Sequence, residues 1–127
     1  MNWFIHTALT MGLASVTAMA VAADNACLLE GSLKIGKQVT QIKDCMQNNG
    51  VKKEQFLQTC KGIAEMGAGM GAPPKVTYLD ACPASPQGVC EGVFGQPIHS
   101  YYYMRSVSDL ADSKASCQKT GGKWRNG

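Results

Sequence analysis

The stretch that decides the fold lies at residues 28–43 and reads LLEGSLKIGKQVTQIK. In its first half, apolar or small residues alternate with polar ones, and this period of two is typical of a β-strand. Gly36-Lys37 follows as a two-residue turn with glycine in the first central position, as a type II′ turn requires. In that register Glu30 faces Lys43, a favourable cross-strand pair. The pattern predicts an N-terminal hairpin, although residues 38–46 also fit a helix.

Residues 51–66 form the clearest predicted helix. Phe56, Cys60 and Ile63 fall on one stripe of the helix, while most of its polar side chains point away from that stripe. Cys60 should therefore face the core and tie this helix to another element. The next eight residues, 67–74, contain three glycines and two prolines, which end the helix and predict a connecting loop. A functional flexible loop is the alternative.

The second half of the chain predicts a small antiparallel sheet closed by a helix. Short β-prone runs occupy residues 75–79, 89–94 and 98–105. A helix follows over residues 109–119, capped by Ser106 or Ser108 and stopped by two glycines, after which Trp124 folds back onto the body. The predicted fold class is therefore α+β. It is a small disulfide-stapled domain with an N-terminal hairpin, a helix, a three-stranded antiparallel sheet and a C-terminal helix.

The N-terminal segment, residues 1–23, has the features of a signal peptide. It carries no Lys, Arg, Asp or Glu, and it ends in small residues at alternate positions, which suit signal peptidase. We expect cleavage after Ala20, Ala22 or Ala23, which leaves residues 24–127 as a single exported domain, periplasmic or secreted. An uncleaved membrane anchor is the alternative. After cleavage, no stable membrane insertion is expected.

Six cysteines lie in the exported part, and all are disulfide candidates: Cys27, Cys45, Cys60, Cys82, Cys90 and Cys117. An even number of cysteines in an oxidising compartment is typical of disulfides. Loop length favours pairing Cys45 with Cys60 and Cys82 with Cys90, which leaves Cys27 for Cys117. The facing of strand and helix favours Cys90–Cys117 instead. The two short bonds would contribute about 3 kcal/mol each on the chain-entropy model.

Composition excludes several classes of function. The formal net charge is +3, and Lys52-Lys53 is the one adjacent basic pair, so nucleic acid is not an expected partner. The chain has no Cys-x-x-Cys, no haem motif and no phosphate-binding loop, so no cofactor is expected. The exported part contains one histidine, His99, and acid–base catalysis and zinc binding mostly use this residue type.

One predicted strand, residues 98–105, carries the most suggestive binding surface. Alternate residues of a strand project to the same side, and on one side of this strand they form a candidate binding patch: His99, Tyr101, Tyr103 and Arg105. Tyr and Arg are enriched in the hot spots of protein interfaces. The alternative is that this side packs under a helix and the other side of the strand is exposed.

These features predict a non-enzymatic exported domain that binds another protein or an envelope component. The alternative is a periplasmic carrier for a soft metal such as copper, or for thiol redox chemistry. Thioethers suit Cu(I), and Met66 and Met70 flank glycines. A third hypothesis is a small hydrolase that uses some of the nine carboxylates. It would need a polar cleft around two acids with perturbed pKa values.

Overall fold

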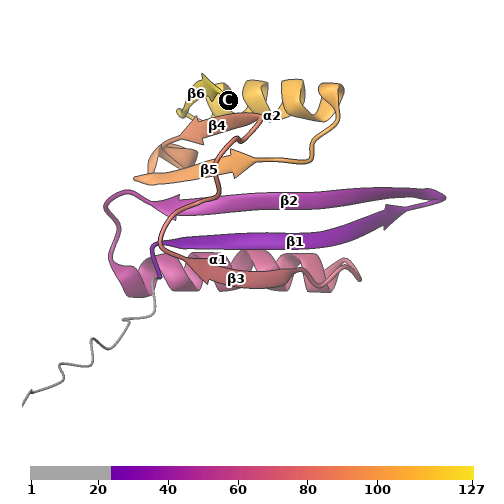
Figure 1. The fold of residues 1–127 in the computed structure, drawn as a ribbon, viewed down its shortest axis with the longest axis horizontal. Coiled ribbons are helices and arrows are strands. Elements are labelled where there is room, and N and C mark those ends of the chain that lie inside the picture. The colour runs from indigo at the N-terminus through magenta and orange to yellow at the C-terminus, as the bar shows by residue number, and fades with distance from the viewer. Residues whose placement is uncertain (1–23) are drawn as a thin grey trace, which may run out of the picture.

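The computed structural model describes residues 24–127, and the predicted leader, residues 1–23, lies outside this part of the chain. The described residues form one antiparallel sheet of six strands, in the order β3-β1-β2-β5-β4-β6, and two α-helices (Figure 1). The strands are β1 (Ala26–Ile35), β2 (Gln38–Asn48), β3 (Lys75–Leu79), β4 (Gly88–Glu91), β5 (Ile98–Tyr102) and β6 (Lys123–Asn126). The helices are α1 (Lys53–Gly69) and α2 (Val107–Lys119).

β1 and β2 are long strands joined by a tight turn at Gly36-Lys37. Gly36 adopts a φ of 62°, a left-handed conformation that glycine reaches without a steric penalty. Glu30 lies opposite Lys43, which is the pair that this turn position dictates. Residues 38–46 belong to β2, and the helical alternative for them is wrong.

The predicted fold class, with its N-terminal hairpin, separate three-stranded sheet and C-terminal helix, is wrong. The hairpin does not stand apart, because the second half of β2 pairs with β5 and joins both halves of the chain in one six-stranded sheet. β3 pairs with β1 instead of with the later strands, and the segment after α2 forms β6 on β4. The physical reason is that a hairpin edge left alone would expose a row of unpaired backbone N–H and C=O groups.

Both helices cover the same face of the sheet, termed the helix face. Directly opposite residues of neighbouring strands project to one side of a sheet, and one such row crosses four strands: Cys27, Met46, Ser100 and Cys90. Cys27 is bonded to Cys60 of α1, and Cys90 is bonded to Cys117 of α2. The helices lie along opposite edges of the sheet, with β2 and β5 between them (Figure 1).

α1 is anchored by a packed core on the helix face. Phe56 and Cys60 are fully buried in one cluster with Leu29 of β1 and Ile98 of β5. Burying a phenylalanine side chain contributes about 1.5–3 kcal/mol. The helix continues to Gly69 instead of ending at residue 66, so the loop expected over residues 67–74 begins later.

α2 has a smaller contact with the sheet. Ser106 is its N-cap, and the Ser106 Oγ accepts a hydrogen bond from the backbone N–H of Asp109 (3.2 Å). Over residues 107–119, Cys117 alone is buried. Its disulfide to Cys90 therefore provides the main attachment of the helix to β4.

A loop at residues 80–87 covers part of the opposite side of the sheet, termed the loop face. Cys82 in this loop is bonded to Cys45 of β2. The Tyr103 hydroxyl donates a hydrogen bond to the carbonyl oxygen of Pro83 (2.6 Å). These contacts close the loop over a second small apolar cluster, which contains Leu28 and Tyr101.

Three disulfides link all six candidate cysteines of the described residues: Cys27–Cys60, Cys45–Cys82 and Cys90–Cys117. The scheme favoured by loop length, with Cys45–Cys60, Cys82–Cys90 and Cys27–Cys117, is wrong in all three pairs. Cys45 projects to the loop face whereas Cys60 lies above the helix face, so these two cannot meet. The pair Cys90–Cys117, which the facing argument favours, is present. A small domain with three disulfides fits an extracellular or secreted protein.

No helix within residues 24–127 combines the length and the apolar character that a membrane crossing requires.

Candidate functional site

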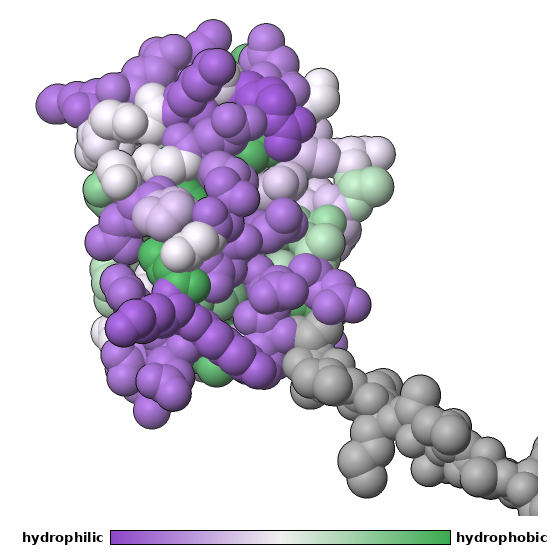
Figure 2. Space-filling view, turned by 90° about the vertical axis from the view of Figure 1, so that its left-hand side faces the viewer, coloured by the Kyte–Doolittle hydropathy of each residue, from purple (hydrophilic) through white to green (hydrophobic). Residues whose placement is uncertain are grey.

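The open part of the helix face, between α1 and α2, is the candidate site and is termed the interhelical groove. It consists of four hollows of about 360, 350, 300 and 190 Å³. Neighbouring hollows share lining residues and so form one depression. The shared residues are Ile42, Ile63, Val93, Phe94, Tyr102, Arg105 and Asp109. Seen from the left-hand side of Figure 1, hydrophobic residues reach the surface between hydrophilic upper and lower parts (Figure 2).

The groove wall formed by α1 is apolar. Ile63, Met66 and Met70 line it at helical spacing, and Met66 and Met70 are 68% and 66% exposed. Methionine side chains are flexible and polarisable, so a surface that contains them adapts to ligands of different shape. Covering these side chains with a ligand would remove apolar surface from water, which is favourable.

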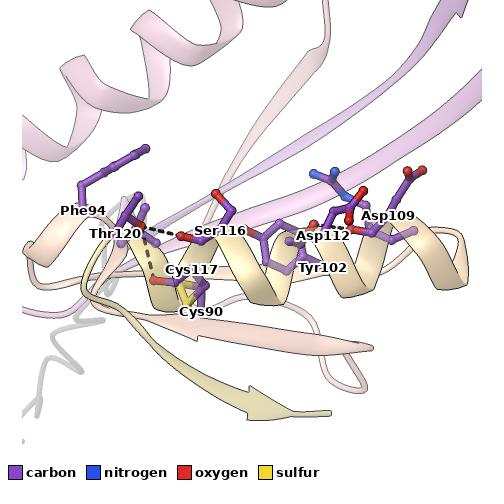
Figure 3. A pocket seen from close by; sticks show the side chains of 11 residues that line it. Cys90, Phe94, Tyr102, Asp109, Asp112, Ser116, Cys117 and Thr120 are labelled. Atoms are coloured by element: carbon purple, nitrogen blue, oxygen red, sulfur yellow. Dashed lines mark hydrogen bonds between the residues drawn. A yellow bond between two sulfur atoms is a disulfide. The ribbon is translucent and has the colours of Figure 1, made fainter.

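The groove wall formed by α2 is acidic and rich in hydroxyl groups. Asp109, Asp112, Ser116 and Thr120 lie in a row along the helix, with Phe94 near one end of the row (Figure 3). None of the ion pairs found within residues 24–127 involves Asp109 or Asp112. Their carboxylates are therefore available to a ligand that carries positive charge.

Phe94 lies at one end of the groove, on the 3₁₀ turn η1 (Val93–Gly95). Its φ is 54°, a left-handed conformation that is uncommon for residues other than glycine. The Phe94 side chain is 75% exposed and lines two of the hollows. Strained residues of this kind cluster at functional sites, so the turn points to Phe94 as a ligand contact.

Hydrogen bonds hold the turn that carries Phe94. The backbone N–H of Gly95 donates to the carbonyl oxygen of Gly92 (3.0 Å). The backbone N–H of Gly92 donates to Nδ1 of His99 (3.2 Å). His99 therefore ties this turn to β5 and positions Phe94.

A polar cluster occupies the middle of the groove floor. The Arg105 guanidinium donates to both carboxylate oxygens of Asp44, through Nη2 (2.6 Å) and Nε (3.4 Å). The Arg105 Cζ lies 4.9 Å from the centroid of the Tyr102 ring, which is a cation–π distance. Each of the four hollows is lined by at least one of these three residues. The cluster therefore lies at the centre of the groove.

Tyr102 is supported from its other side by Trp124 of β6. The two rings stack with their centroids 5.8 Å apart. Gly88 lies directly opposite Tyr102 on β4, and a Cβ at this position would collide with the indole ring of Trp124. Glycine is therefore required at position 88 for the stack to form.

Burial changes the acidity of the floor residues. It raises the pKa of the Asp44 carboxyl above its ordinary value, and the hydrogen bond and positive charge of Arg105 offset part of that rise. Burial also raises the pKa of the Tyr102 hydroxyl, with a further increase from the charge of Asp44. The Tyr102 hydroxyl is therefore protonated at neutral pH.

The residues of the predicted binding patch lie on two sides of the sheet. His99, Tyr101 and Tyr103 project to the loop face, where Tyr101 and Tyr103 pack against the cluster beneath the loop. Arg105 follows the end of β5 and reaches the helix face, where it pairs with Asp44. The structure thus brings three of the four together and places the fourth in the interhelical groove.

The sulfur-containing residues are divided between the core and the groove. All six cysteines of residues 24–127 are in disulfides. Met66 and Met70 line one hollow, and Met46, which is buried beneath α1, borders another. Within the part of the chain that the structure describes, no three His, Cys, Asp or Glu side chains gather as a metal-binding group.

Sequence reasoning missed Phe94, Asp109 and Asp112 as site residues. A signal existed for Phe94, because Gly92 and Gly95 flank it and glycines at such spacing mark a tight turn. No sequence signal places the acidic residues of α2 opposite the apolar residues of α1. That arrangement depends on the long-range pairing of β2 with β5.

Comparison of the chain with protein-family models, with curated proteins and with solved structures finds no match. The assignment of the interhelical groove as the candidate site therefore depends on the geometry and chemistry of this chain alone.

Proposed function

We propose that residues 24–127 form a non-enzymatic exported binding module, which holds a segment of another protein or of an envelope component in the interhelical groove. The observation that carries this proposal is the exposure of Phe94, Met66 and Met70 around one depression. Apolar side chains gathered around a depression are typical of ligand-binding surfaces.

The polar groups near the groove support binding over catalysis. The Asp44 carboxylate accepts two hydrogen bonds from the Arg105 guanidinium. His99 accepts a hydrogen bond from the backbone of the turn that carries Phe94. Asp44 and His99 therefore already have structural partners. In a binding role, Asp44 forms part of a fixed groove floor and His99 supports the turn that carries Phe94.

The soft-metal alternative retains one favourable observation, since Met66 and Met70 line the same hollow. Thiol redox chemistry is not favoured, because the six cysteines of the described residues form disulfides. Titration of the oxidised protein with Cu(I) and a competing chelator tests the metal hypothesis. Binding that is abolished by Met66→Leu plus Met70→Leu would support a copper carrier.

The binding proposal is tested with peptides of about 12 residues, a length that as a helix spans about 18 Å, selected from a random displayed library on the oxidised protein. We expect the selected peptides to bind Phe94→Ala about tenfold more weakly, because a buried aromatic contact is lost. Val107→Ala is the matched control, because Val107 is 91% exposed and lies outside the four hollows. Equal binding to all three proteins, or no selection above background, would contradict the proposal.

A further inference from the structure

We infer that the occupant of the interhelical groove is a cationic amphipathic peptide segment, with its apolar side against α1 and its lysine or arginine side against α2. This inference rests on the proposed binding function and adds the chemistry of the ligand. Its starting point is the difference between the two walls: Ile63, Met66 and Met70 form one of them, and Asp109 and Asp112 belong to the other.

The groove has a charge opposite in sign to that of the whole chain. The chain carries 12 Lys and Arg residues against 9 Asp and Glu residues. Among the lining residues of the four hollows, Arg105 is the one basic residue, whereas three are acidic: Asp44, Asp109 and Asp112. The groove is therefore formally −2 in a chain of +3. Cations are attracted to this depression, and anions are repelled from it.

Asp44 does not supply this attraction, because Arg105 neutralises it. The two carboxylates of α2 do, since no ion pair of the described residues involves them. Asp109 and Asp112 are three positions apart on the helix, so both lie towards the same side of it (Figure 3). A ligand that presents two basic side chains one helical turn apart would match them.

The middle of the groove floor favours recognition of the ligand through its side chains. From Asp44 to Asn48, β2 is paired with both β1 and β5, and β5 is paired with β2 and β4, so this part of the floor has no free edge. A peptide cannot add to the sheet at this place. The lining residues of α1 and its C-cap run from Thr59 to Met70, and those of α2 and its C-cap run from Asp109 to Thr120. Each wall is therefore about 16 Å long, which matches an amphipathic helix of about 11 residues.

The test compares two synthetic peptides of about 12 residues on the oxidised protein. In the first peptide, leucine residues recur at helical spacing along one side of the helix and lysine residues along the other. The second peptide has glutamate in place of each lysine. We expect the lysine peptide to bind at least about tenfold more tightly than the glutamate peptide at low salt, with the difference reduced as the salt concentration rises.

Asp109→Asn plus Asp112→Asn should weaken the binding of the lysine peptide by about tenfold, as expected for the loss of two charge pairs at the surface. The matched control is Glu54→Gln plus Asp80→Asn, which removes two exposed carboxylates that lie outside the groove and should leave binding unchanged. Thermal unfolding of each variant checks that the fold is retained.

Failure of this inference is distinct from failure of the binding function. If library-selected peptides depend on Phe94 but the lysine peptide binds no better than the glutamate peptide, the cationic ligand is excluded and the binding groove stands. If the lysine peptide binds equally to the Asp109/Asp112 variant and to its control, the attraction comes from elsewhere and the inference is wrong. If no peptide depends on Phe94, the binding function itself is contradicted.

Discussion

The two helices that wall the groove are attached to the sheet in different ways. α1 buries Phe56 and Cys60 in a core shared with β1, β2 and β5. Over residues 107–119, α2 buries Cys117 alone. Each helix has one disulfide to the sheet, but only α1 also has a packed core beneath it. The groove therefore has one wall fixed by packing and one wall that depends on a covalent bond.

This difference indicates how a small disulfide-bonded domain divides its stability between packing and covalent bonds. A short chain buries a smaller fraction of its surface than a long one, and most of the apolar core here lies in the first half of the chain. The second half relies on the Cys90–Cys117 bond and on the stack of Tyr102 with Trp124. We expect perturbations of the two halves to have different local consequences.

The largest expected effect is on the free energy of unfolding, and it distinguishes α1, which is held by a packed core, from α2, which is held mainly by its disulfide. Phe56→Ala should lower the free energy of unfolding by about 3–5 kcal/mol, because it leaves a cavity in the core beneath α1. Leu110→Ala on α2 is the matched change, and because Leu110 is only half-buried we expect about 1 kcal/mol. Urea denaturation of the oxidised proteins measures both. Equal losses would show that α2 is packed as firmly as α1.

Removing one disulfide at a time also tests whether α1 and α2 are attached to the sheet in different ways. Cys90→Ala plus Cys117→Ala should cost about 3.5 kcal/mol, and Cys27→Ala plus Cys60→Ala about the same, since the bonds close loops of similar length. The local results should differ. Amide hydrogen exchange should become fast throughout α2 in the first variant, while α1 keeps its protection in the second because Phe56 remains buried. Retained protection of α2 would overturn the comparison.

Gly88→Ala tests whether the aromatic stack supports the second half. The new methyl group would displace the Trp124 ring, and we expect a loss of about 1–3 kcal/mol from overpacking. Trp124 is the single tryptophan of residues 24–127, so its fluorescence should change as well. The control is Gly62→Ala on α1, where a Cβ meets nothing within 4 Å. There we expect a gain of about 0.5–1 kcal/mol. An unchanged fluorescence spectrum in Gly88→Ala would contradict the stack.

The smallest expected effect is on the pH dependence of stability, and it concerns Tyr103 on the loop face, where both halves of the chain contribute residues. Burial raises the pKa of the Tyr103 hydroxyl to about 12, with a contribution from Tyr101. The folded state therefore holds this proton more tightly than the unfolded chain does. The stabilisation is complete below the ordinary pKa of 10 and is lost as the pH rises from there to about 12.

Tyr103→Phe should reduce the fall in stability over that alkaline range, because the titrating hydroxyl is gone. It should also lower stability modestly at neutral pH, by about 1 kcal/mol, through the lost hydrogen bond to Pro83. Tyr78→Phe, an exposed tyrosine on β3, is the control. Thermal unfolding at several pH values measures the difference. An identical alkaline profile in wild type and Tyr103→Phe would show that Tyr103 is not protected by the loop.

Local structure could be predicted from the sequence where neighbours along the chain determine it. Gly36-Lys37 sets the turn between β1 and β2 and thereby the pairing of Glu30 with Lys43. The stripe of Phe56 and Cys60 identifies the buried side of α1. The cap at Ser106 identifies the start of α2. Each of these features depends on a few successive residues.

The arrangement of the sheet and the site could not be predicted in the same way. The pairing of β2 with β5 and of β3 with β1 joins segments that are distant in sequence, and alternation alone does not choose a partner strand. Arg105 continues the alternation of the predicted patch, but the strand ends at Tyr102, and the chain then turns Arg105 towards Asp44. The groove exists only once both helices are placed on one face.

The most direct test of the groove as a binding site is a map of backbone amide chemical shifts in isotopically labelled protein, recorded with and without a library-selected peptide. We expect the largest shifts on the second half of α1, on the turn around Phe94 and along α2. Shifts confined to the loop face, around Tyr103 and the loop at residues 80–87, would contradict it.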